Sequence, residues 1–262
     1  MPQDFASSYA PTSSSTAASR RRTATGSAGY LFDDRLYRAL RELGLTVRIE
    51  FDVDEWKRFI LATEWPVVNA AADPAYHDFA AGEVFWMRLS RGAETVATQV
   101  FRVITTDDYV GMVADHSLFF GDNPSGFRDF QLLARPDMPT IGGLVVQLSG
   151  LYIRPDWRRA RTADGMRLVA AWTRLSHSFT ARNLMADWSV SLVEERLATP
   201  RMIEELYGYA HSGELFETYE PALGHRERVS LMWMSAEELV CSVASRPRPI
   251  ARHAHPELHT AG

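Results

Sequence analysis

The sequence predicts an α/β protein built around a mixed sheet. Residues 84–90 and 95–104 are rich in strand-forming side chains and flank a turn at 91–93, which is the pattern of a hairpin. Residues 141–153 form a long, nearly continuous apolar segment that is typical of a central strand covered on both faces. A helical apolar stripe and another strand follow it. Hairpins combined with such a crossover helix predict a layered α/β structure.

The first elements of the chain alternate between helix and strand. Asp33 opens an apolar stripe of helical spacing that closes at Gly44. Residues 45–51 then alternate as a strand, and 52–65 read as a helix that stops before a proline. After the hairpin, residues 106–140 hold apolar patches broken by Gly, Asn and Pro, and we interpret them as an inserted loop region that could line a site.

Gly150 interrupts the long apolar strand, which indicates a bulge or a close approach of another group to the backbone. The helix after this strand has one apolar stripe, formed by Leu168, Trp172, Leu175 and Phe179. The remaining elements are a strand at 183–193, a short helix at 199–210, two closing strands at 214–219 and 228–234, and a terminal helix at 236–240.

The chain of 262 residues, 46% of them hydrophobic, is sufficient for one sizeable core. We place this domain at 30–245. Residues 1–29 are mostly Ser, Ala and Thr with one basic triplet and are read as a disordered tail, with an organelle transit segment as the alternative. Residues 246–262 are read as a flexible C-terminal tail. A metal site at its histidines, His253, His255 and His259, is not expected, because no framework of carboxylates or thiols accompanies them.

The overall charge excludes some classes of partner. A formal net charge of -5 gives no global basic field, so neither nucleic acid nor a membrane surface is an expected partner. No apolar run reaches the roughly 20 residues that a membrane helix needs. The single cysteine, Cys241, cannot form a disulfide within the chain and fits a reducing, cytoplasmic location. A homodimer is kept open as the assembly.

Three arginines, Arg158, Arg159 and Arg161, precede the helix that follows the long strand. The N-terminus of a helix carries unpaired N–H groups and a partial positive charge, so added cations repel it unless an anion neutralises both. This pattern predicts a phosphate or pyrophosphate site. The alternative is a solvated turn whose arginines pair with Asp156 and Asp164.

The segment from this strand to the helix resembles the acetyl-CoA-binding segment of the GCN5-related N-acetyltransferases (GNAT superfamily). Ile153-Arg154-Pro155 matches the family's strand end, Arg158 its first turn position and Ala163 its last. Arg161 stands where the family has a glycine. The resemblance covers roughly residues 45–240 in element order. It implies a GNAT-like fold, with a mixed, mostly antiparallel central sheet flanked by helices, and acetyl-CoA or another acyl-CoA as co-substrate.

The resemblance also implies site residues. The pyrophosphate would lie on the turn, and the pantetheine arm along residues 148–153. Tyr207 matches a tyrosine that protonates the leaving thiolate in the family. An amine acceptor must lose a proton before it attacks, and Asp187 is our first candidate base, with a structural carboxylate as the alternative. Glu194 and Glu195 are weaker candidates. The predicted co-substrate contacts are Leu151, Tyr152, Ile153, Arg158, Arg159, Ala160, Arg161, Thr162 and Ala163.

The function these residues predict is an acyl-CoA-dependent N-acyltransferase. It would transfer an acetyl group to a small-molecule amine or a protein amino group, directly within a ternary complex and without a metal. The alternative is a non-catalytic binding or regulatory module with a degenerate acetyl-CoA site, which Arg161 supports. The sequence has neither the Gly-x-Ser-x-Gly elbow of serine hydrolases nor a phosphate-binding Gly-x-x-x-x-Gly-Lys loop.

Overall fold

The computed structural model describes residues 29–121, 130–133, 138–220 and 225–244. Its strands are β1 (Thr46–Glu50), β2 (Val84–Arg91), β3 (Glu94–Thr106), β4 (Phe130–Leu132), β5 (Gly143–Ile153), β6 (Trp188–Glu194), β7 (His211–Glu220) and β8 (His225–Ser235). Its α-helices are α1 (Asp34–Glu42), α2 (Val53–Leu61), α3 (Tyr109–Ala114), α4 (Ser117–Phe120), α5 (Leu168–Phe179) and α6 (Ala236–Ala244).

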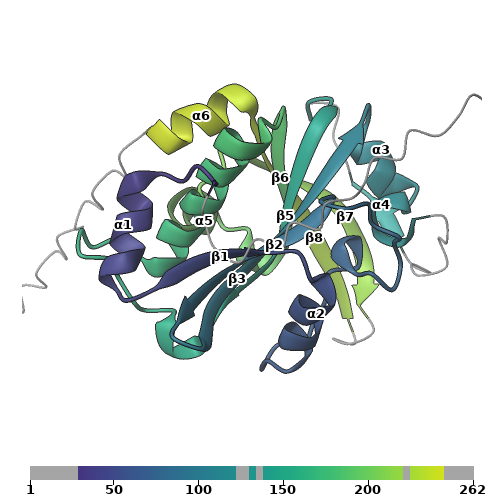
Figure 1. The fold of residues 1–262 in the computed structure, drawn as a ribbon. Coiled ribbons are helices and arrows are strands. Elements are labelled where there is room, and N and C mark those ends of the chain that lie inside the picture. The colour runs from purple at the N-terminus through teal and green to yellow at the C-terminus, as the bar shows by residue number, and fades with distance from the viewer. Residues whose placement is uncertain (1–28, 122–129, 134–137, 221–224, 245–262) are drawn as a thin grey trace, which may run out of the picture.

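The strands form one eight-stranded sheet within the described ranges, in the order β1-β2-β3-β5-β6-β8-β7-β4 (Figure 1). Every neighbouring pair is antiparallel except β5 and β6, which are parallel and joined by α5. A parallel pair requires a crossover connection, and α5 supplies it. The prediction of a mixed, mostly antiparallel sheet flanked by helices is confirmed, with β5 in a central position.

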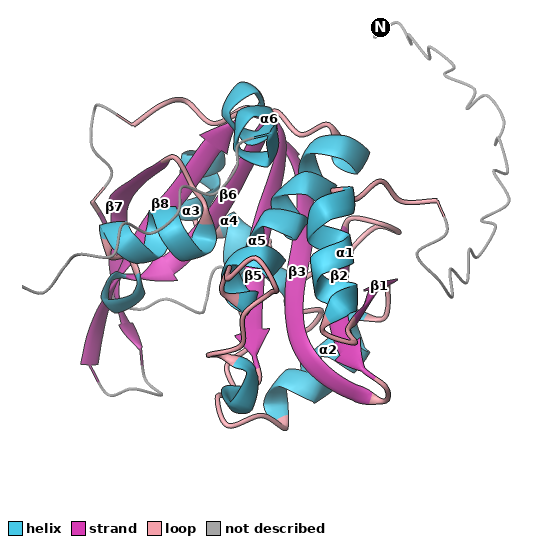
Figure 2. Ribbon diagram, turned by 90° about the vertical axis from the view of Figure 1, so that its left-hand side faces the viewer, coloured by secondary structure: helices cyan, strands magenta, loops and turns pink. Residues whose placement is uncertain are grey.

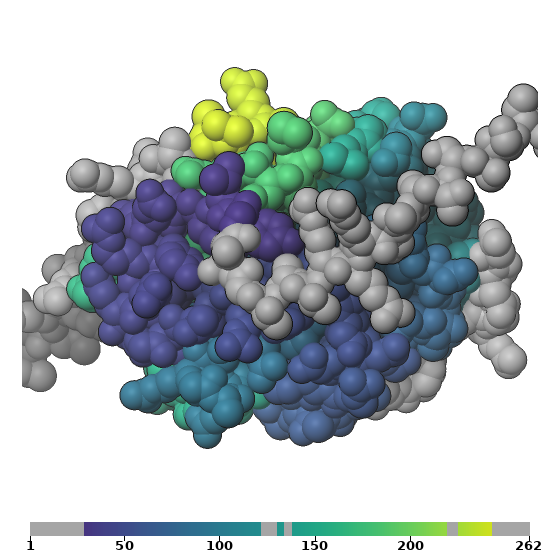
Figure 3. All heavy atoms as spheres, in the orientation of Figure 1, coloured from purple at the N-terminus to yellow at the C-terminus, as the bar shows by residue number. Residues whose placement is uncertain are grey.

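Helices cover both faces of the sheet. Helices α1, α5 and α6 lie on one face, and α2, α3 and α4 lie on the other (Figures 1 and 2). Successive side chains of β5 point to opposite faces of the sheet. Val146 packs into the core under α1 and α5, whereas Val145 packs against α3 and α4. Helix α6, in yellow at the top of the space-filling view, packs against α5 (Figure 3).

Local signals in the sequence account for the helix boundaries. Asp33 caps α1 by accepting a hydrogen bond from the Leu36 N–H, and Asp52 caps α2 in the same way from the Glu55 N–H. The predicted apolar stripe of α5 is buried along its whole length, at Leu168, Trp172, Leu175 and Phe179. These predictions are confirmed because each depends on contacts within one or two turns of chain.

The prediction that residues 106–140 form a loop region was wrong. The described part of the segment holds α3, α4 and β4, and the apolar side chains of α3 and α4 that are buried share a core with Val145 and Val190. Gly111, which resembles a helix breaker, lies in the first turn of α3, where its N–H binds the capping carboxylate of Asp108. A Cβ at this position would collide with that carboxylate, so glycine here supports the helix.

The predicted tails, 1–29 and 246–262, fall outside the described residues except for Gly29. Among the residues that are described, no helix has both the length and the apolar character needed to cross a bilayer. Over the same ranges, no group of three or more His, Cys, Asp or Glu side chains is arranged to hold a metal ion.

Candidate functional site

The parallel strands β5 and β6 separate in the middle of the sheet. They pair only where Val145–Gln147 lies beside Trp188–Val190. Beyond this point β5 stays paired with β3 up to Ile153, and β6 stays paired with β8 up to Glu194. The facing edges of the two strands therefore have no neighbouring strand over the second half of β5. Such an edge presents backbone N–H and C=O groups to whatever enters the gap.

A bulge in β5 accompanies this separation, as predicted from Gly150. The register between β3 and β5 shifts between Thr98 and Val100, and Gly150 has a φ of 56°, in the left-handed region that favours glycine. Side chains of β3 bind the bulged backbone, because Gln99 Nε2 donates to the Ser149 carbonyl at 2.7 Å and Thr98 Oγ1 donates to the Gly150 carbonyl at 3.2 Å.

A pocket of about 210 Å³ occupies the gap. Its walls come from both strands, from α5, from the segment around Tyr207 and from the connection before η1 (Ala70–Ala72, a short 3₁₀ turn). The lining residues are Asn69, Gln99, Leu148, Ser149, Gly150, Leu151, Thr173, His177, Ser191, Leu192, Val193, Glu194, Leu197, Tyr207, Tyr209 and Met232.

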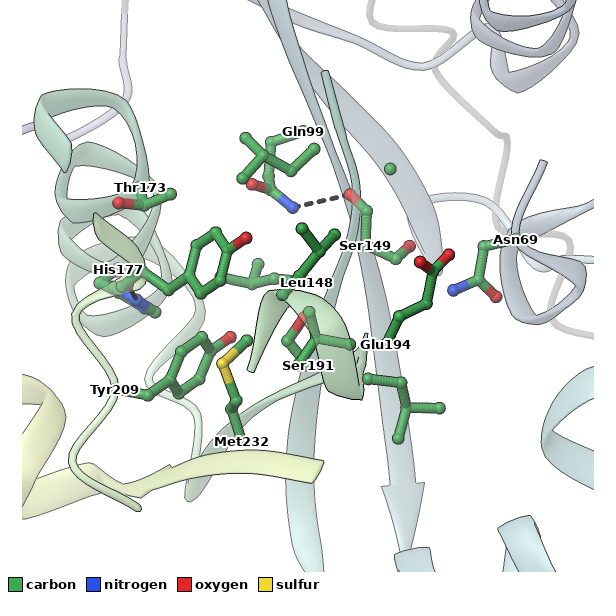
Figure 4. Close-up of a pocket in the computed structure, with 16 residues that line it drawn as sticks. Asn69, Gln99, Leu148, Ser149, Thr173, His177, Ser191, Glu194, Tyr209 and Met232 are labelled. Atoms are coloured by element: carbon green, nitrogen blue, oxygen red, sulfur yellow. Dashed lines mark hydrogen bonds between the residues drawn. The ribbon is translucent and has the colours of Figure 1, made fainter. Parts of the chain in front are cut away.

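The pocket passes through the plane of the sheet. Leu148 belongs to the core beneath α5, and Thr173 and His177 project from that helix. Asn69 lies on the other face, before the short turn that packs against α4. Figure 4 shows these two groups of residues on opposite sides of the strands, with Ser191 between them. Two molecules could therefore approach the gap from opposite faces.

Tyr207 is the predicted general acid, and it lines the pocket. It is the last residue of a π-helical segment, η5 (Met202–Tyr207), which ends at Gly208 with a φ of 75°. Its side chain is largely buried. Burial raises the pKa of the Tyr207 phenol, and the negative charge of Glu194 raises it further. The phenol therefore stays protonated at neutral pH and can donate a proton.

Glu194, a weaker candidate in the sequence, is the only carboxylate among the pocket-lining residues. It ends β6 and forms an ion pair with Arg196, whose guanidinium lies over the Trp65 ring at 5.1 Å from the centroid. Its side chain is 29% exposed, so a proton taken up here can leave to water. A carboxylate in this position can accept a proton or hold a cationic group.

The structure does not bring Asp187 to the pocket. Asp187 lies just before β6, at the end where β5 and β6 are paired, and its Oδ2 accepts a hydrogen bond from the Leu144 N–H at 2.7 Å. Gly143 packs directly beneath this carboxylate. Asp187 thus binds the backbone outside the pocket, which favours its alternative interpretation as a structural carboxylate, and we take Glu194 as the candidate base.

The arginine turn differs in detail from its prediction. The Arg158 guanidinium donates to the Ile153 carbonyl at 3.0 Å and forms an ion pair with Glu64, 94 residues away. The carboxylates predicted to pair with the three arginines have other partners: Asp156 pairs with Arg154, and Asp164 accepts a hydrogen bond from the Thr162 hydroxyl. None of the residues 158–163 lines the pocket.

Backbone groups of the turn are partly committed to a small hairpin. The Thr162 N–H donates to the Met166 carbonyl, and the Ala160 N–H donates to the Trp157 carbonyl. Helix α5 begins at Leu168, five residues beyond Ala163, and no side chain caps its N-terminus. The Leu168 N–H donates to the Ala160 carbonyl, so the groups left for an anion are the later first-turn amides of α5 and the exposed arginines, a smaller set than the predicted cradle at 158–163.

Sequence reasoning missed His177 and Thr173, which line the pocket from α5. His177 is 1% exposed, and its Nε2 lies 2.8 Å from the Tyr207 carbonyl oxygen. Burial lowers the pKa of His177 to about 4, so the ring is neutral at physiological pH. The available signal was a threonine and a histidine four residues apart, and therefore on one face of the predicted helix.

The buried His177 predicts a pH dependence of stability. Above about pH 6.5 the ring is neutral in both states, whereas below it the unfolded chain binds a proton that the folded protein excludes until about pH 4. Stability is therefore lost as pH falls through this window. Relative to His177→Gln, the wild type should lose ~2.5 kcal/mol more between pH 7 and pH 4.5. Urea unfolding at both pH values measures this difference, and equal losses would contradict it.

The chain was compared with known proteins. No family model matches it, and no curated protein matches it. Solved structures do match. A Drosophila melanogaster polyamine N-acetyltransferase that forms N-acetylagmatine is 14% identical, with a TM-score of 0.40 over 73% of this chain and 99% of that chain. An aminoglycoside N(6′)-acetyltransferase from Legionella pneumophila is 9% identical, with a TM-score of 0.41 over 76% and 95%.

A third match is an agmatine N-acetyltransferase variant in its apo form, 13% identical, with a TM-score of 0.42 over 73% of this chain and 99% of that chain. All three are N-acetyltransferases. At such low identity a match describes the fold alone and transfers no activity. The chemistry of this chain therefore has to come from its own residues.

Proposed function

We propose that this protein is an acyl-CoA-dependent N-acyltransferase that transfers an acetyl group directly from acetyl-CoA to an amine. The observation that carries the proposal is the gap between β5 and β6, because it combines an unpaired strand edge with a pocket lined by residues from both faces of the sheet. Tyr207 and Glu194, a protonated phenol and a carboxylate, line the same pocket. The acceptor is a small-molecule amine or a protein amino group.

The unpaired edge of β5 suits an extended, amide-containing chain such as the pantetheine arm. An extended ligand can add to such an edge as an extra strand, with main-chain hydrogen bonds giving affinity. Leu148–Leu151 lines the pocket and supplies this edge. Tyr152 and Ile153 contribute backbone only, because the Tyr152 hydroxyl binds Glu64 and the Ile153 side chain is buried in the core.

The diphosphate of the co-substrate would lie where β5 leads into α5. The uncapped N-terminus of α5 and the exposed side chains of Arg159 and Arg161 are the groups suited to it. Arg158 can take part by exchanging Glu64 for a phosphate oxygen. Thr162 is buried and its hydroxyl is bonded within the turn, so it does not belong to this set.

Different groups of the pocket carry out different steps of the proposed reaction. Glu194 takes the proton from the ammonium group of the acceptor, either directly or through water, so that the nitrogen lone pair can form the new bond to the acyl carbon. Backbone N–H groups beside the bulge stabilise negative charge on the acyl oxygen. Tyr207 gives its proton to the sulfur as the carbon–sulfur bond breaks. The nitrogen, positively charged after its attack, loses a second proton, which returns through water to the Tyr207 phenolate. The products are an N-acetylamine and free coenzyme A.

One experiment tests the function directly. The purified protein is incubated with acetyl-CoA and a panel of primary amines while free thiol is followed, and the acetylated amine is identified by mass spectrometry. Thiol release that depends on the amine supports the proposal. Coenzyme A binding without thiol release over the whole panel would instead favour a non-catalytic module. Arg161 in place of glycine and the committed amides of Ala160 and Thr162 favour that second candidate.

Arg158→Glu should weaken coenzyme A binding at least tenfold. The substitution replaces a phosphate partner with a carboxylate and places it against Glu64, so the turn would repel an anion. Isothermal titration calorimetry with coenzyme A measures the effect. Arg48→Glu, the same charge change on the exposed edge strand β1, is the control and should leave affinity within twofold. Unchanged affinity in Arg158→Glu would show that the turn does not contact the ligand.

A further inference from the structure

Two buried side chains of α5 bind consecutive carbonyl groups at the end of η5. Thr173 Oγ1 donates to the Leu206 carbonyl at 2.5 Å, and His177 Nε2 lies 2.8 Å from the Tyr207 carbonyl oxygen. Thr173 is 4% exposed and His177 is 1% exposed. Because they are four residues apart, both project from one face of the helix, as Figure 4 shows.

These carbonyls need donors from outside their own segment. The last carbonyl groups of a helix have no partner within it. Here the chain turns at Gly208, and the N–H groups of Gly208 and Tyr209 both donate back to the Ile203 carbonyl. These two N–H groups therefore do not donate to the carbonyl of Leu206 or of Tyr207. The side chains of α5 fill that role, and each contact holds the segment that carries Tyr207 against the helix.

The hydrogen bond to Tyr207 defines the chemical state of His177. A carbonyl oxygen only accepts, so Nε2 carries the ring proton and Nδ1 carries the lone pair. The Tyr209 ring meets the imidazole edge-on, with centroids 4.7 Å apart and an angle of 89°. Gly208 packs beside the ring, since a Cβ there would lie in van der Waals contact with its Cδ2, at 3.7 Å. The imidazole is thus a packed, neutral donor.

We propose that His177, with Thr173, is a positioning residue that fixes the direction of the Tyr207 phenol in the pocket. The proposal rests on the proposed function for its consequence in catalysis. Holding the Tyr207 carbonyl fixes the backbone from which the phenol extends, and Tyr207 lines the same pocket as both donors. Loss of either donor would let the end of η5 move away from α5. A misplaced proton donor slows the chemical step without weakening the binding of the co-substrate.

The test separates the effect of losing the hydrogen-bond donor from the effect of losing the packed imidazole ring. His177→Leu removes the donor, and His177→Gln keeps an N–H at a similar reach. We expect His177→Leu to lower kcat at least tenfold with KM for acetyl-CoA within twofold, and His177→Gln to recover to within threefold of the wild type. Thr173→Val should lower kcat at least threefold. Ser176→Ala is the control, because this buried hydroxyl binds only the Trp172 carbonyl in its own helix.

Two results would overturn the proposal. The first is an unchanged kcat in folded His177→Leu and Thr173→Val. The second is an equal loss in the Gln and Leu variants, which would make the role of His177 one of packing. Amide hydrogen exchange at 202–209 provides a readout without catalysis: His177→Leu should speed exchange there, and Ser176→Ala should not. If the wild type released no thiol, the proposed function would fail, while exchange would still decide the contact between α5 and η5.

Discussion

Tyr207→Phe should lower kcat about a hundredfold while leaving the affinity for coenzyme A within twofold. General acid catalysis by a positioned side chain contributes about 10²–10⁴-fold, and the phenylalanine ring keeps the shape of the pocket while removing the proton. Burial and the charge of Glu194 both raise the pKa of Tyr207, so the wild-type phenol is protonated at neutral pH. Steady-state kinetics and calorimetry on the same preparation measure the two quantities separately.

Tyr209→Phe is the comparison for this experiment. Tyr209 lines the same pocket two residues further along, is 4% exposed and packs against His177. Burial raises the pKa of its phenol too, although the Ser189 and Ser191 hydroxyls oppose this effect. If Tyr209→Phe lost more activity than Tyr207→Phe, the proton donor would be Tyr209. Equal loss of turnover and of coenzyme affinity in Tyr207→Phe would mean that Tyr207 binds the ligand and does not protonate the thiolate.

Gly150→Ala should destabilise the protein by ~3 kcal/mol and abolish measurable coenzyme A binding. A Cβ on Gly150 would lie 2.5 Å from Cζ2 of Trp56 and 3.3 Å from Cγ2 of Val100. Trp56 is fully buried, so its ring cannot move aside without disturbing the core beneath α2. Left-handed backbone costs a non-glycine residue about 1–2 kcal/mol, and overpacking adds about 1–3 kcal/mol.

Gly92→Ala separates these two costs. Gly92 has a φ of 59°, close to the 56° of Gly150, but a Cβ there would have no atom within 4 Å. It should therefore cost ~1 kcal/mol, from the backbone alone, and leave coenzyme A binding unchanged. Urea denaturation of both variants and calorimetry with coenzyme A give the comparison. Equal destabilisation of the two would show that Trp56 yields to the added methyl group and that the bulge does not depend on glycine.

Predictions that depended on short stretches of chain were confirmed. The helix start at Asp33, the buried stripe of α5 and the bulge at Gly150 each follow from residues a few positions apart. Residues 106–140 were misread because their helices are short and a glycine lies inside one. Only burial against Val145 and Val190 on other strands stabilises such segments, and no local pattern reports it.

The candidate site was predicted in part. Tyr207 and the stretch Leu148–Leu151 do line the pocket, although the role of each stays a prediction. Asp187 and Glu194 lie at opposite ends of one strand, and the sequence favoured Asp187 over Glu194 as the base. The choice between them depends on which end of β6 separates from β5, and that depends on the bulge and on pairing with β8.

The sequence by itself determined the element types outside residues 106–140, the central strand with its bulge and the basic turn before α5, since each is encoded in adjacent residues. Only the tertiary structure decided that Arg158 pairs with Glu64, that Asn69 and Glu194 share a pocket, and that His177 binds the Tyr207 carbonyl. These contacts join residues far apart in the chain. They form because strand order and the separation of β5 from β6 place the segments together, and both depend on packing across the whole sheet.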